Sequence, residues 1–287
     1  MKVWLDGGIL DPDRARIGVC DHGLLYGDGV FEGIRSYGRR LFRLADHLER
    51  LEISARALAL RLPAGRERLG AIVRETVAAV PGSDVYARLI VTRGEGALGV
   101  DPASCSAPRI VCMADEVALF SPEIRARGLE LVTSSVRRPS ADQLDPRIKS
   151  LNYLPSVLAK QEARRVGADE ALLLNPAGRV AEASVANVFC ARHGRLATPP
   201  ASEGALEGIT RATVLELARE VGLDPVERPL TRLDLLAADE VLLTGTGAGI
   251  VGVRALDGRR IGRGAPGRVL RELERVFAEY VRKDAAC

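Results

Sequence analysis

Lysine is nearly absent from this sequence of 287 residues. Only four of its 41 basic residues are lysines, namely Lys2, Lys149, Lys160 and Lys283, and arginine supplies the rest. A solvated surface cation can be either residue, but a covalent bond to an aldehyde carbon requires a primary amine. A lysine in the middle of so arginine-rich a chain is therefore a candidate for chemistry that arginine cannot perform.

Other scarcities exclude whole classes of protein. The net charge is only +3, which is too small for a dedicated nucleic-acid-binding protein. No run approaches the roughly 20 apolar residues of a membrane span, and the first residues do not resemble a secretory leader. The five cysteines form no C-x-x-C pair, and the three histidines lack metal-ligand spacing. We expect a cytoplasmic protein with reduced thiols, no metal and no membrane anchor.

The length and a hydrophobic content of 47% predict two packed lobes. We place the boundary near residues 116–124, which gives an N-terminal lobe of residues 1–118 and a larger C-terminal lobe of residues 119–287. In the first lobe, local patterns predict strands and hairpins over residues 4–11, 17–42, 85–92 and 108–113, and helices over residues 44–62 and 66–80.

The second lobe mixes strand and helix patterns. Strands are predicted over residues 129–138, 169–175, 188–192 and 240–245, and helices over residues 153–167, 210–222 and 265–282. This order predicts an α/β or α+β lobe with a mixed sheet rather than repeated βαβ units.

Lys149 lies where a strand-like segment gives way to a helix, in DPRIKSLNYLPSVLAKQEA. A side chain at such a junction can project into a cleft, although an exposed loop lysine fits the same pattern. Glu182 follows in the apolar segment RVAEASVANVF, and a helix opens at Gly208, Ile209 and Thr210. The first N–H groups of a helix favour an anion, although Thr210 could equally be an ordinary cap.

At this point the chain resembles the fold-type IV pyridoxal-phosphate enzymes, and among them the branched-chain amino-acid aminotransferases. The resemblance is carried by seven motifs in family order, which span nearly the whole chain: YGDGVFEGIR, FRLADHLERL, VYARLIVTRG, KSLNYL, EASVANVF, LEGITR and LLTGTGAG. It implies a two-lobed α/β (α+β) fold-type IV architecture and pyridoxal 5'-phosphate (PLP) as cofactor.

The resemblance also implies cofactor-binding residues. Lys149 would bind PLP covalently and then move a proton at the substrate's Cα, because an amine can do both. Glu182 would pair with the pyridine nitrogen. The phosphate would be held by Arg50, Ile209, Thr210 and Thr246, the phenolic oxygen by Tyr153, and the ring by Leu206.

For the substrate, the resemblance points to seven further positions, which are Tyr26, Phe31, Gly33, Tyr86, Arg88, Gly247 and Ala248. Aromatic walls accept aliphatic side chains, and turn amides hold a carboxylate. Arg88 could pair with the second carboxylate of glutamate, or could be a strand-end arginine in an ordinary ion pair. Two residues depart from the family pattern, namely Ala183, where a glycine is usual, and Gly249, where an acidic residue is often found.

The expected reaction is transamination between a branched-chain L-amino acid and 2-oxoglutarate, carried out by a homodimer. A D-amino-acid transaminase and an aminodeoxychorismate lyase are alternatives, since they share the lysine, the glutamate and the phosphate site. A catalytically silent homologue is a third possibility, disfavoured because Lys149 occurs with all of its expected cofactor partners.

Overall fold

The computed structural model describes residues 1–116, 120–264 and 266–284. Their contacts divide the chain into two compact units. The described part of unit 1 comprises residues 1–116, 148–152 and 281–284, and that of unit 2 comprises residues 120–147 and 153–280 without residue 265. The predicted boundary between residues 118 and 119 lies outside the described residues.

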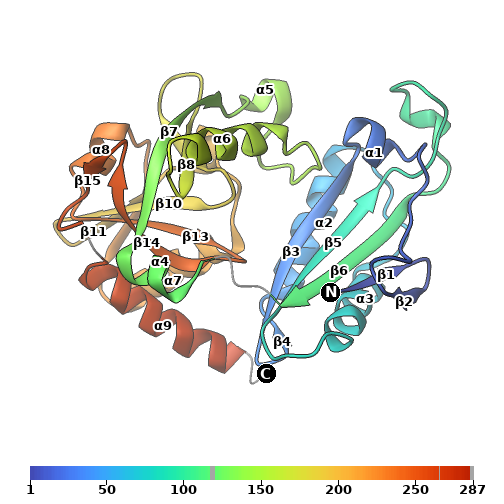
Figure 1. Ribbon diagram of the computed structural model, residues 1–287, viewed down its shortest axis with the longest axis horizontal. Helices are drawn as coiled ribbons and strands as arrows, with labels where there is room; N and C mark the ends of the chain where they lie inside the picture. The colour runs from blue at the N-terminus through green and yellow to red at the C-terminus, as the bar shows by residue number, and fades with distance from the viewer. Residues whose placement is uncertain (117–119, 265, 285–287) are drawn as a thin grey trace. The chain divides into compact units, whose positions relative to one another are not determined.

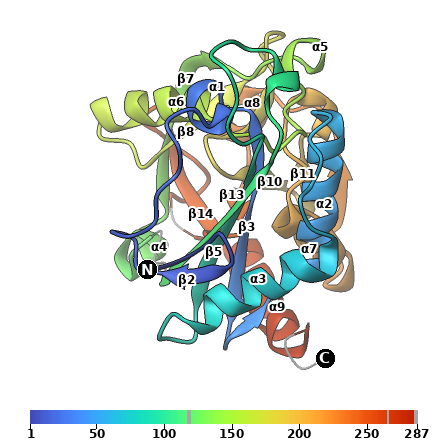
Figure 2. The same ribbon diagram turned by 90° about the vertical axis from the view of Figure 1, so that its right-hand side faces the viewer.

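Unit 1 is built on an antiparallel sheet with the strand order β2-β1-β6-β5-β3-β4. Its strands are β1 (Lys2–Leu5), β2 (Gly8–Leu10), β3 (Gly29–Tyr37), β4 (Arg40–Leu41), β5 (Val85–Thr92) and β6 (Arg109–Glu116). The helices α2 (Leu44–Ala57) and α3 (Arg66–Ala78) lie on one face of this sheet (Figure 1, Figure 2). Apolar side chains from the sheet and from both helices form the core between them.

The N-terminal predictions match β5, agree with α3 and β6 to within three residues at each end, and are too simple elsewhere. The helix predicted over residues 44–62 ends at Ala57, because Ala59 has a left-handed φ of 48° that an α-helix cannot continue through. Within the predicted strands of residues 17–42, the structure has the short helix α1 (His22–Tyr26). Asp21 caps this helix by accepting from the N–H of Gly23 at 2.7 Å, so local capping overrides the strand pattern.

Lys149 belongs to unit 1, whereas the prediction placed it in the C-terminal lobe. The segment of residues 148–152 pairs with the beginning of β3, which explains the difference. The N–H of Phe31 donates to the carbonyl of Lys149 at 3.0 Å, and Val30 forms an antiparallel bridge with Ser150. Long-range backbone pairing of this kind is invisible to local sequence patterns.

Unit 2 contains the mixed sheet that the sequence predicts, with the order β12-β11-β10-β13-β14-β7-β8-β9 and with β15 beside β14. The pairs β11–β12, β14–β7 and β7–β8 are parallel, and the other pairs are antiparallel. The strands are β7 (Leu129–Arg137), β8 (Glu170–Leu174), β9 (Val180–Ala183), β10 (Asn187–Arg192), β11 (Arg195–Thr198), β12 (Asp224–Glu227), β13 (Glu240–Gly245), β14 (Gly249–Leu256) and β15 (Arg259–Arg260). The predicted α+β class is therefore confirmed.

The helices of unit 2 are α4 (Pro122–Arg127), α5 (Ala141–Leu144), α6 (Leu154–Arg165), α7 (Ile209–Glu220), α8 (Arg232–Leu236) and α9 (Arg268–Asp284), the last of which runs into unit 1. Figure 1 shows α6 lying beside β7 and β8. The sequence patterns did not predict α4, which begins where Ser121 accepts from the N–H of Ile124 at 3.4 Å. Within the described part of the chain, no helix is both long and apolar enough to span a bilayer.

Candidate active site

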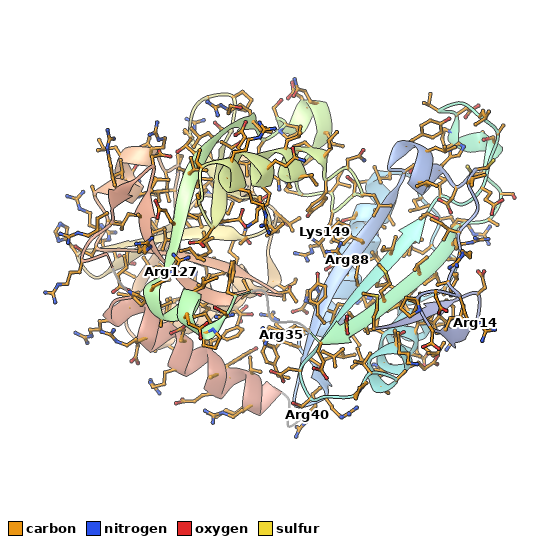
Figure 3. All side chains as sticks on the ribbon, viewed as in Figure 1. Arg14, Arg35, Arg40, Arg88, Arg127 and Lys149 are labelled. Atoms are coloured by element: carbon orange, nitrogen blue, oxygen red, sulfur yellow. The ribbon has the colours of Figure 1, made fainter. Side chains whose placement is uncertain are left out.

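In unit 1, Lys149 and Arg88 share one aromatic neighbour. The Nζ of Lys149 lies 4.5 Å from the centre of the Phe31 ring, and the Cζ of Arg88 lies 5.0 Å from the same centre. Figure 3 shows both side chains beside β3. Arg88 pairs with Gly33 across the sheet, and residues two apart on a strand share a face, so Phe31 and Arg88 lie on the same side. A primary amine, an apolar ring and a guanidinium group are thus brought together.

The predicted residues Gly33, Tyr86 and Tyr26 lie in the same unit. A Cβ atom added to Gly33 would lie 2.0 Å from the hydroxyl of Tyr86, so any side chain at position 33 would displace that tyrosine. Tyr26 ends α1, and its hydroxyl accepts from the N–H of Gly99 at 2.8 Å. Gly33 therefore provides room for Tyr86, while Tyr26 fixes the loop that follows β5.

The backbone of Lys149 is held on two sides. Its N–H donates to the hydroxyl of Ser54 on α2 at 3.1 Å, and its carbonyl accepts from Phe31. Ser54 lies on the same face of α2 as His47 and Arg50, because residues three, four and seven apart share a helix face. That polar face meets Glu32 of β3.

Glu32, His47 and Arg50 form a buried network, which we call the Glu32 triad. The Nε and Nη2 atoms of Arg50 donate to the two carboxylate oxygens of Glu32, each at 2.7 Å, and Nδ1 of His47 lies 2.7 Å from Oε2. Burial favours a raised pKa for Glu32, but Arg50 and His47 together lower it to about 2. Burial lowers the pKa of His47, and the charges of Arg50 and Lys149 act in the same direction, against the raising effect of Glu32.

In unit 2, Glu182 lies on β9 with its side chain 4% exposed. Its Oε2 accepts from the side-chain amide of Asn187 and from the N–H of Leu206, each at 3.1 Å. Its Oε1 accepts from the guanidinium group of Arg138. Burial opposes the charge of Arg138, but Glu182 raises the pKa of that guanidinium, with Tyr153 contributing in the same direction. The structure thus brings Glu182 together with the predicted residue Leu206.

The predicted phosphate residues of unit 2 lie at a helix start and in a turn. Ile209 and Thr210 open α7 after Gly208, which caps the helix without a side chain, so backbone N–H groups dominate this end. The turn Thr246–Ala248 joins β13 to β14. Arg125 of α4 anchors this turn, because it donates to the carbonyl oxygen of Ala248 at 2.5 Å and to that of Ile250 at 3.1 Å.

The two departures from the family pattern have different settings. Ala183 is fully buried, and its N–H donates to the carbonyl of Ala186 at 2.7 Å in the turn after β9. Gly249 has a φ of 66°, which is the left-handed region that favours glycine, and open space surrounds the position of a Cβ atom. The departure at position 249 therefore suits the backbone conformation of this chain.

Five supporting residues were not singled out from the sequence: Glu32, Ser54, Arg125, Arg138 and Asn187. Glu32 could have been identified from the sequence, because a carboxylate within the apolar strand segment VFEGI indicates a buried charge that needs partners. His47 is one of the three histidines without metal-ligand spacing, and the structure buries it beside Glu32. Among the described residues, no group of three or more His, Cys, Asp and Glu residues could hold a metal ion.

Comparison with known proteins identifies the family. A model of the family described as Amino-transferase class IV matches residues 29–256. The chain belongs to this family. A protein of Methanocaldococcus jannaschii, provisionally named a branched-chain-amino-acid aminotransferase, is 45% identical over 97% of this chain and 96% of its own length. The branched-chain-amino-acid aminotransferase of Pseudomonas aeruginosa is 36% identical over 97% of this chain and 92% of its own length.

Solved structures confirm the fold of this class IV aminotransferase. The branched-chain amino acid aminotransferase of Thermobaculum terrenum, in its PLP-bound holo form, has a TM-score of 0.88 at 33% identity and covers 99% of this chain and 94% of that one. The Escherichia coli enzyme has a TM-score of 0.93 at 32% identity, with 97% and 93% covered. Class IV aminotransferases depend on PLP, so this chain is a PLP-dependent transaminase.

The residues of each unit fit that cofactor. Unit 1 offers a primary amine on a fixed backbone and an arginine whose orientation is set by a buried carboxylate. Unit 2 offers a buried carboxylate facing a cation and a helix start with N–H groups for an anion. These are the group types that an aldehyde, a phosphate and a pyridine nitrogen require.

Proposed function

We propose that this transaminase exchanges amino groups between branched-chain aliphatic L-amino acids and 2-oxoglutarate. The named relatives that cover nearly the whole chain, at 33 to 45% identity, carry branched-chain names. The observation that carries the proposal is the Phe31 ring, whose centre lies 4.5 Å from the Nζ of Lys149 and 5.0 Å from the Cζ of Arg88. An aliphatic side chain can pack on such a ring, while a second carboxylate can pair with the guanidinium group.

Lys149 is the proposed catalytic residue. PLP, when bound, supplies an aldehyde for amines and a ring that accepts the electrons released at the substrate's Cα. Lys149 holds the cofactor and carries the Cα proton on its Nζ, which must be neutral to accept it.

The remaining cofactor contacts are proposed from the positions of these residues. Glu182 keeps a proton on the pyridine nitrogen, because a buried carboxylate stabilises a cation beside it. Leu206 packs against the ring, and Tyr153 donates to the phenolic oxygen. Four residues bind the phosphate through their donors, namely Arg50, Ile209, Thr210 and Thr246.

The substrate contacts are divided by chemistry. Tyr26, Phe31 and Tyr86 supply apolar and aromatic surface, and Gly33 leaves room for Tyr86. The N–H groups of Gly247 and Ala248 bind the α-carboxylate, in a turn held by Arg125. Arg88 is exposed, and within the described parts of the chain its guanidinium group contacts the Phe31 ring but makes no ion pair or hydrogen bond, so it can pair with a substrate carboxylate.

Borohydride reduction followed by peptide mapping tests the role of Lys149. The reduced cofactor is expected on Lys149, with Lys160 as the internal comparison. The amine of Lys160 is engaged by Glu170 at 2.9 Å and by the carbonyl of Asp169 at 2.6 Å, which disfavours reaction there. Label on Lys160, or no covalent label after reconstitution with PLP, would refute the assignment.

A substrate panel separates the proposed activity from its alternatives. L-leucine, D-alanine and aminodeoxychorismate are offered separately to the enzyme loaded with PLP, and the change in visible absorption is followed. Rapid reaction with L-leucine supports the proposal. A preference for D-alanine or for aminodeoxychorismate identifies the transaminase or lyase alternative, and no reaction with any of them identifies a silent homologue.

The assembly and location of the protein stay predictions. We expect a homodimer, which light scattering on the purified protein measures directly. A cytoplasmic location is likewise a prediction, to be tested by fractionation of the source cells.

A further inference from the structure

Glu32 is a buried carboxylate that needs charged or polar partners. It lies on β3 with none of its surface exposed, and its partners Arg50 and His47 come from α2, three residues apart. Arg50 approaches it side-on, with Nε on one oxygen and Nη2 on the other. Two parallel hydrogen bonds fix the plane of a guanidinium group, which one bond cannot do.

His47 completes the Glu32 triad without adding charge. Its Nδ1 must carry a proton, because the neighbouring carboxylate oxygen can only accept. Its Nε2 is buried and has no hydrogen-bond partner among the described residues, and its pKa lies below the ordinary value. Arg50, Lys149 and Glu32 are the charged groups that act on it. His47 is therefore neutral, and the positive charge of Arg50 is balanced by Glu32.

A neutral triad cannot attract an anion through net charge. It can bind one only if the guanidinium N–H groups point in the correct direction. We infer that Glu32, supported by His47, is a positioning residue that fixes Arg50 for a phosphate monoester, so that direction rather than net charge determines the affinity. This inference rests on the proposed role of Arg50 as a phosphate ligand.

Removing the charge of Glu32 tests whether phosphate affinity depends on the orientation of the Arg50 guanidinium group or on the net charge of the triad. Glu32→Gln deletes one negative charge beside Arg50, so an effect of net charge alone would strengthen phosphate binding. Glutamine has one acceptor oxygen and one donor group, so it cannot accept both arginine N–H groups. If the orientation of the Arg50 N–H groups determines the affinity, Glu32→Gln binds PLP more weakly than the wild type, by roughly ten- to a hundredfold.

The measurement is a titration of cofactor-free enzyme with PLP and, separately, with pyridoxal, which lacks the phosphate. Glu32→Gln should raise the Kd for PLP and leave that for pyridoxal within about twofold. Glu32→Asp keeps the charge but withdraws the carboxylate from Arg50, so it should also weaken PLP binding. In an Arg50→Met background, Glu32→Gln should have little further effect, because its action passes through the arginine.

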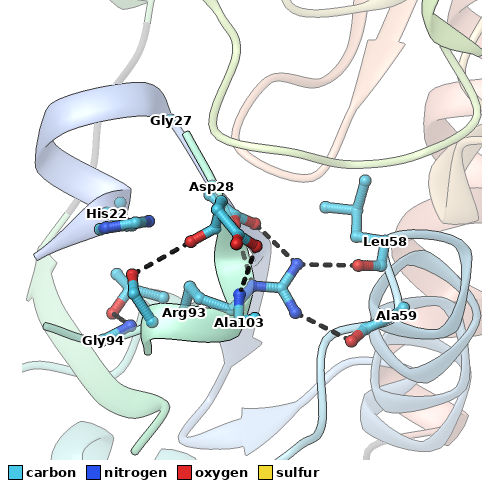
Figure 4. A network of polar contacts seen from close by, with 12 residues as sticks. His22, Gly27, Asp28, Leu58, Ala59, Arg93, Gly94 and Ala103 are labelled. Carbon is cyan, nitrogen blue, oxygen red and sulfur yellow. Dashed lines mark hydrogen bonds and ion pairs between the residues drawn. The ribbon is translucent and has the colours of Figure 1, made fainter. Parts of the chain in front are cut away.

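A second carboxylate–guanidinium pair in unit 1 provides a matched control. Arg93 donates to Asp28 from Nε at 2.8 Å and from Nη2 at 3.0 Å, and it also donates to the carbonyls of Leu58 and Ala59 just after α2 (Figure 4). Asp28→Asn removes a comparable pair at the end of the same helix. It should change the affinity for PLP and for pyridoxal by less than about twofold.

The outcomes separate the inference from the proposed function. If Arg50→Met leaves the PLP affinity unchanged, Arg50 is not a phosphate ligand. The proposed role of Arg50 and the positioning role of Glu32 then both fail. If Arg50→Met weakens PLP binding but Glu32→Gln does not, only the positioning role fails. If Glu32→Gln does not fold, Glu32→Asp and His47→Leu, which removes the third hydrogen bond, provide the same test. Equal losses of PLP and pyridoxal binding in these variants would indicate a merely structural role and overturn the inference.

Discussion

The two units each bury a carboxylate against an arginine, but the partners differ. Glu32 of unit 1 accepts from two side chains of one helix, and it engages Arg50 with both oxygens. Glu182 of unit 2 accepts from the N–H of Leu206 and from Asn187, and it engages Arg138 with Oε1. The carboxylate of Glu182 is therefore fixed by donors from separate segments of unit 2.

This difference separates the residues that fix an orientation from the residues that are proposed to contact the cofactor. In unit 1, the carboxylate holds the arginine, and the proposed ligand contact belongs to Arg50. In unit 2, the backbone, Asn187 and Arg138 hold the carboxylate, and the proposed contact belongs to Glu182. A buried ion pair adds little net stability relative to apolar side chains of similar volume, because desolvation offsets attraction, so orientation is the better explanation of both pairs.

The largest expected effect comes from Glu182→Gln, which should lower kcat by roughly 100- to 1,000-fold. The amide keeps the shape but loses the charge that favours a protonated pyridine nitrogen. Cofactor affinity should fall by less than about tenfold, because the phosphate contacts are intact. Glu32→Gln should show the opposite pattern, with weak cofactor binding and near-normal turnover once PLP saturates the enzyme.

Steady-state rates measured at saturating PLP, together with cofactor titrations, check this contrast. Glu170→Gln is the control, since Glu170 is also buried in unit 2 and pairs with Lys160 at 2.9 Å. Its turnover should stay close to that of the wild type. Wild-type turnover in Glu182→Gln would mean that Glu182 is not the partner of the pyridine nitrogen.

The pH dependence of stability gives the next largest effect. The pKa of Glu32 is about 2 in the folded protein, below the ordinary value of 4.5. A lowered carboxyl pKa contributes stability above pH 4.5 that is lost as the pH falls toward 2. The shift corresponds to about 3 kcal/mol, so the stability difference between wild type and Glu32→Gln should shrink by about that amount over this range.

Urea unfolding at pH values from 6 down to 2 measures this difference. Asp28→Asn is again the comparison in unit 1, because the Asp28 side chain is 22% exposed and Glu32 is fully buried. A constant difference between wild type and Glu32→Gln across the acid range would show that the triad does not hold Glu32 in its charged form.

Local sequence patterns predicted the elements that depend on neighbours along the chain. The predictions for β5 and β13 match the observed bounds, since a run of apolar residues between turns determines such strands. The helix α1 was missed, because five residues are too few to show a helical period. The pairing of residues 148–152 with β3 was also beyond local patterns, since those partners lie more than 100 residues apart.

Site residues were predicted where a residue type is rare or where a motif of the family resemblance contains them, as for Arg50 and Arg88, and arginines outside those motifs were missed. Lys149 was noticeable because lysine is scarce. Arg125 and Arg138 were not, because one arginine among so many carries no signal of its own. Their importance depends on tertiary contacts. Arg125 donates to carbonyl oxygens at the turn after β13, and Arg138 donates to the carboxylate of Glu182.

Arg88 sharpens the comparison, because it faces a ring where Arg50 and Arg138 face carboxylates. Arg88→Ala should reduce kcat/KM for glutamate by roughly ten- to a hundredfold and that for L-leucine much less. Only glutamate brings a second carboxylate that needs a cation. Single-turnover series with each amino acid measure the two half-reactions, and equal losses would place Arg88 at the shared α-carboxylate.

The smallest effect is expected from a third carboxylate, Glu240 of β13, which faces backbone donors. It accepts from the N–H groups of Gly267, Val269 and Leu270 at 2.8 to 3.1 Å and so caps the start of α9. A negative charge at a helix N-terminus stabilises the helix, so Glu240→Gln should cost about 1 kcal/mol of unfolding free energy. Because this carboxylate holds a backbone segment rather than an arginine and has no proposed ligand, kcat and cofactor affinity should stay within about twofold of the wild type. Urea unfolding and the same titrations test both statements. A large loss of activity in Glu240→Gln would show that a fixed, half-buried carboxylate matters for function even without an arginine partner. The partners of Glu32 and Glu182 would then no longer distinguish their roles.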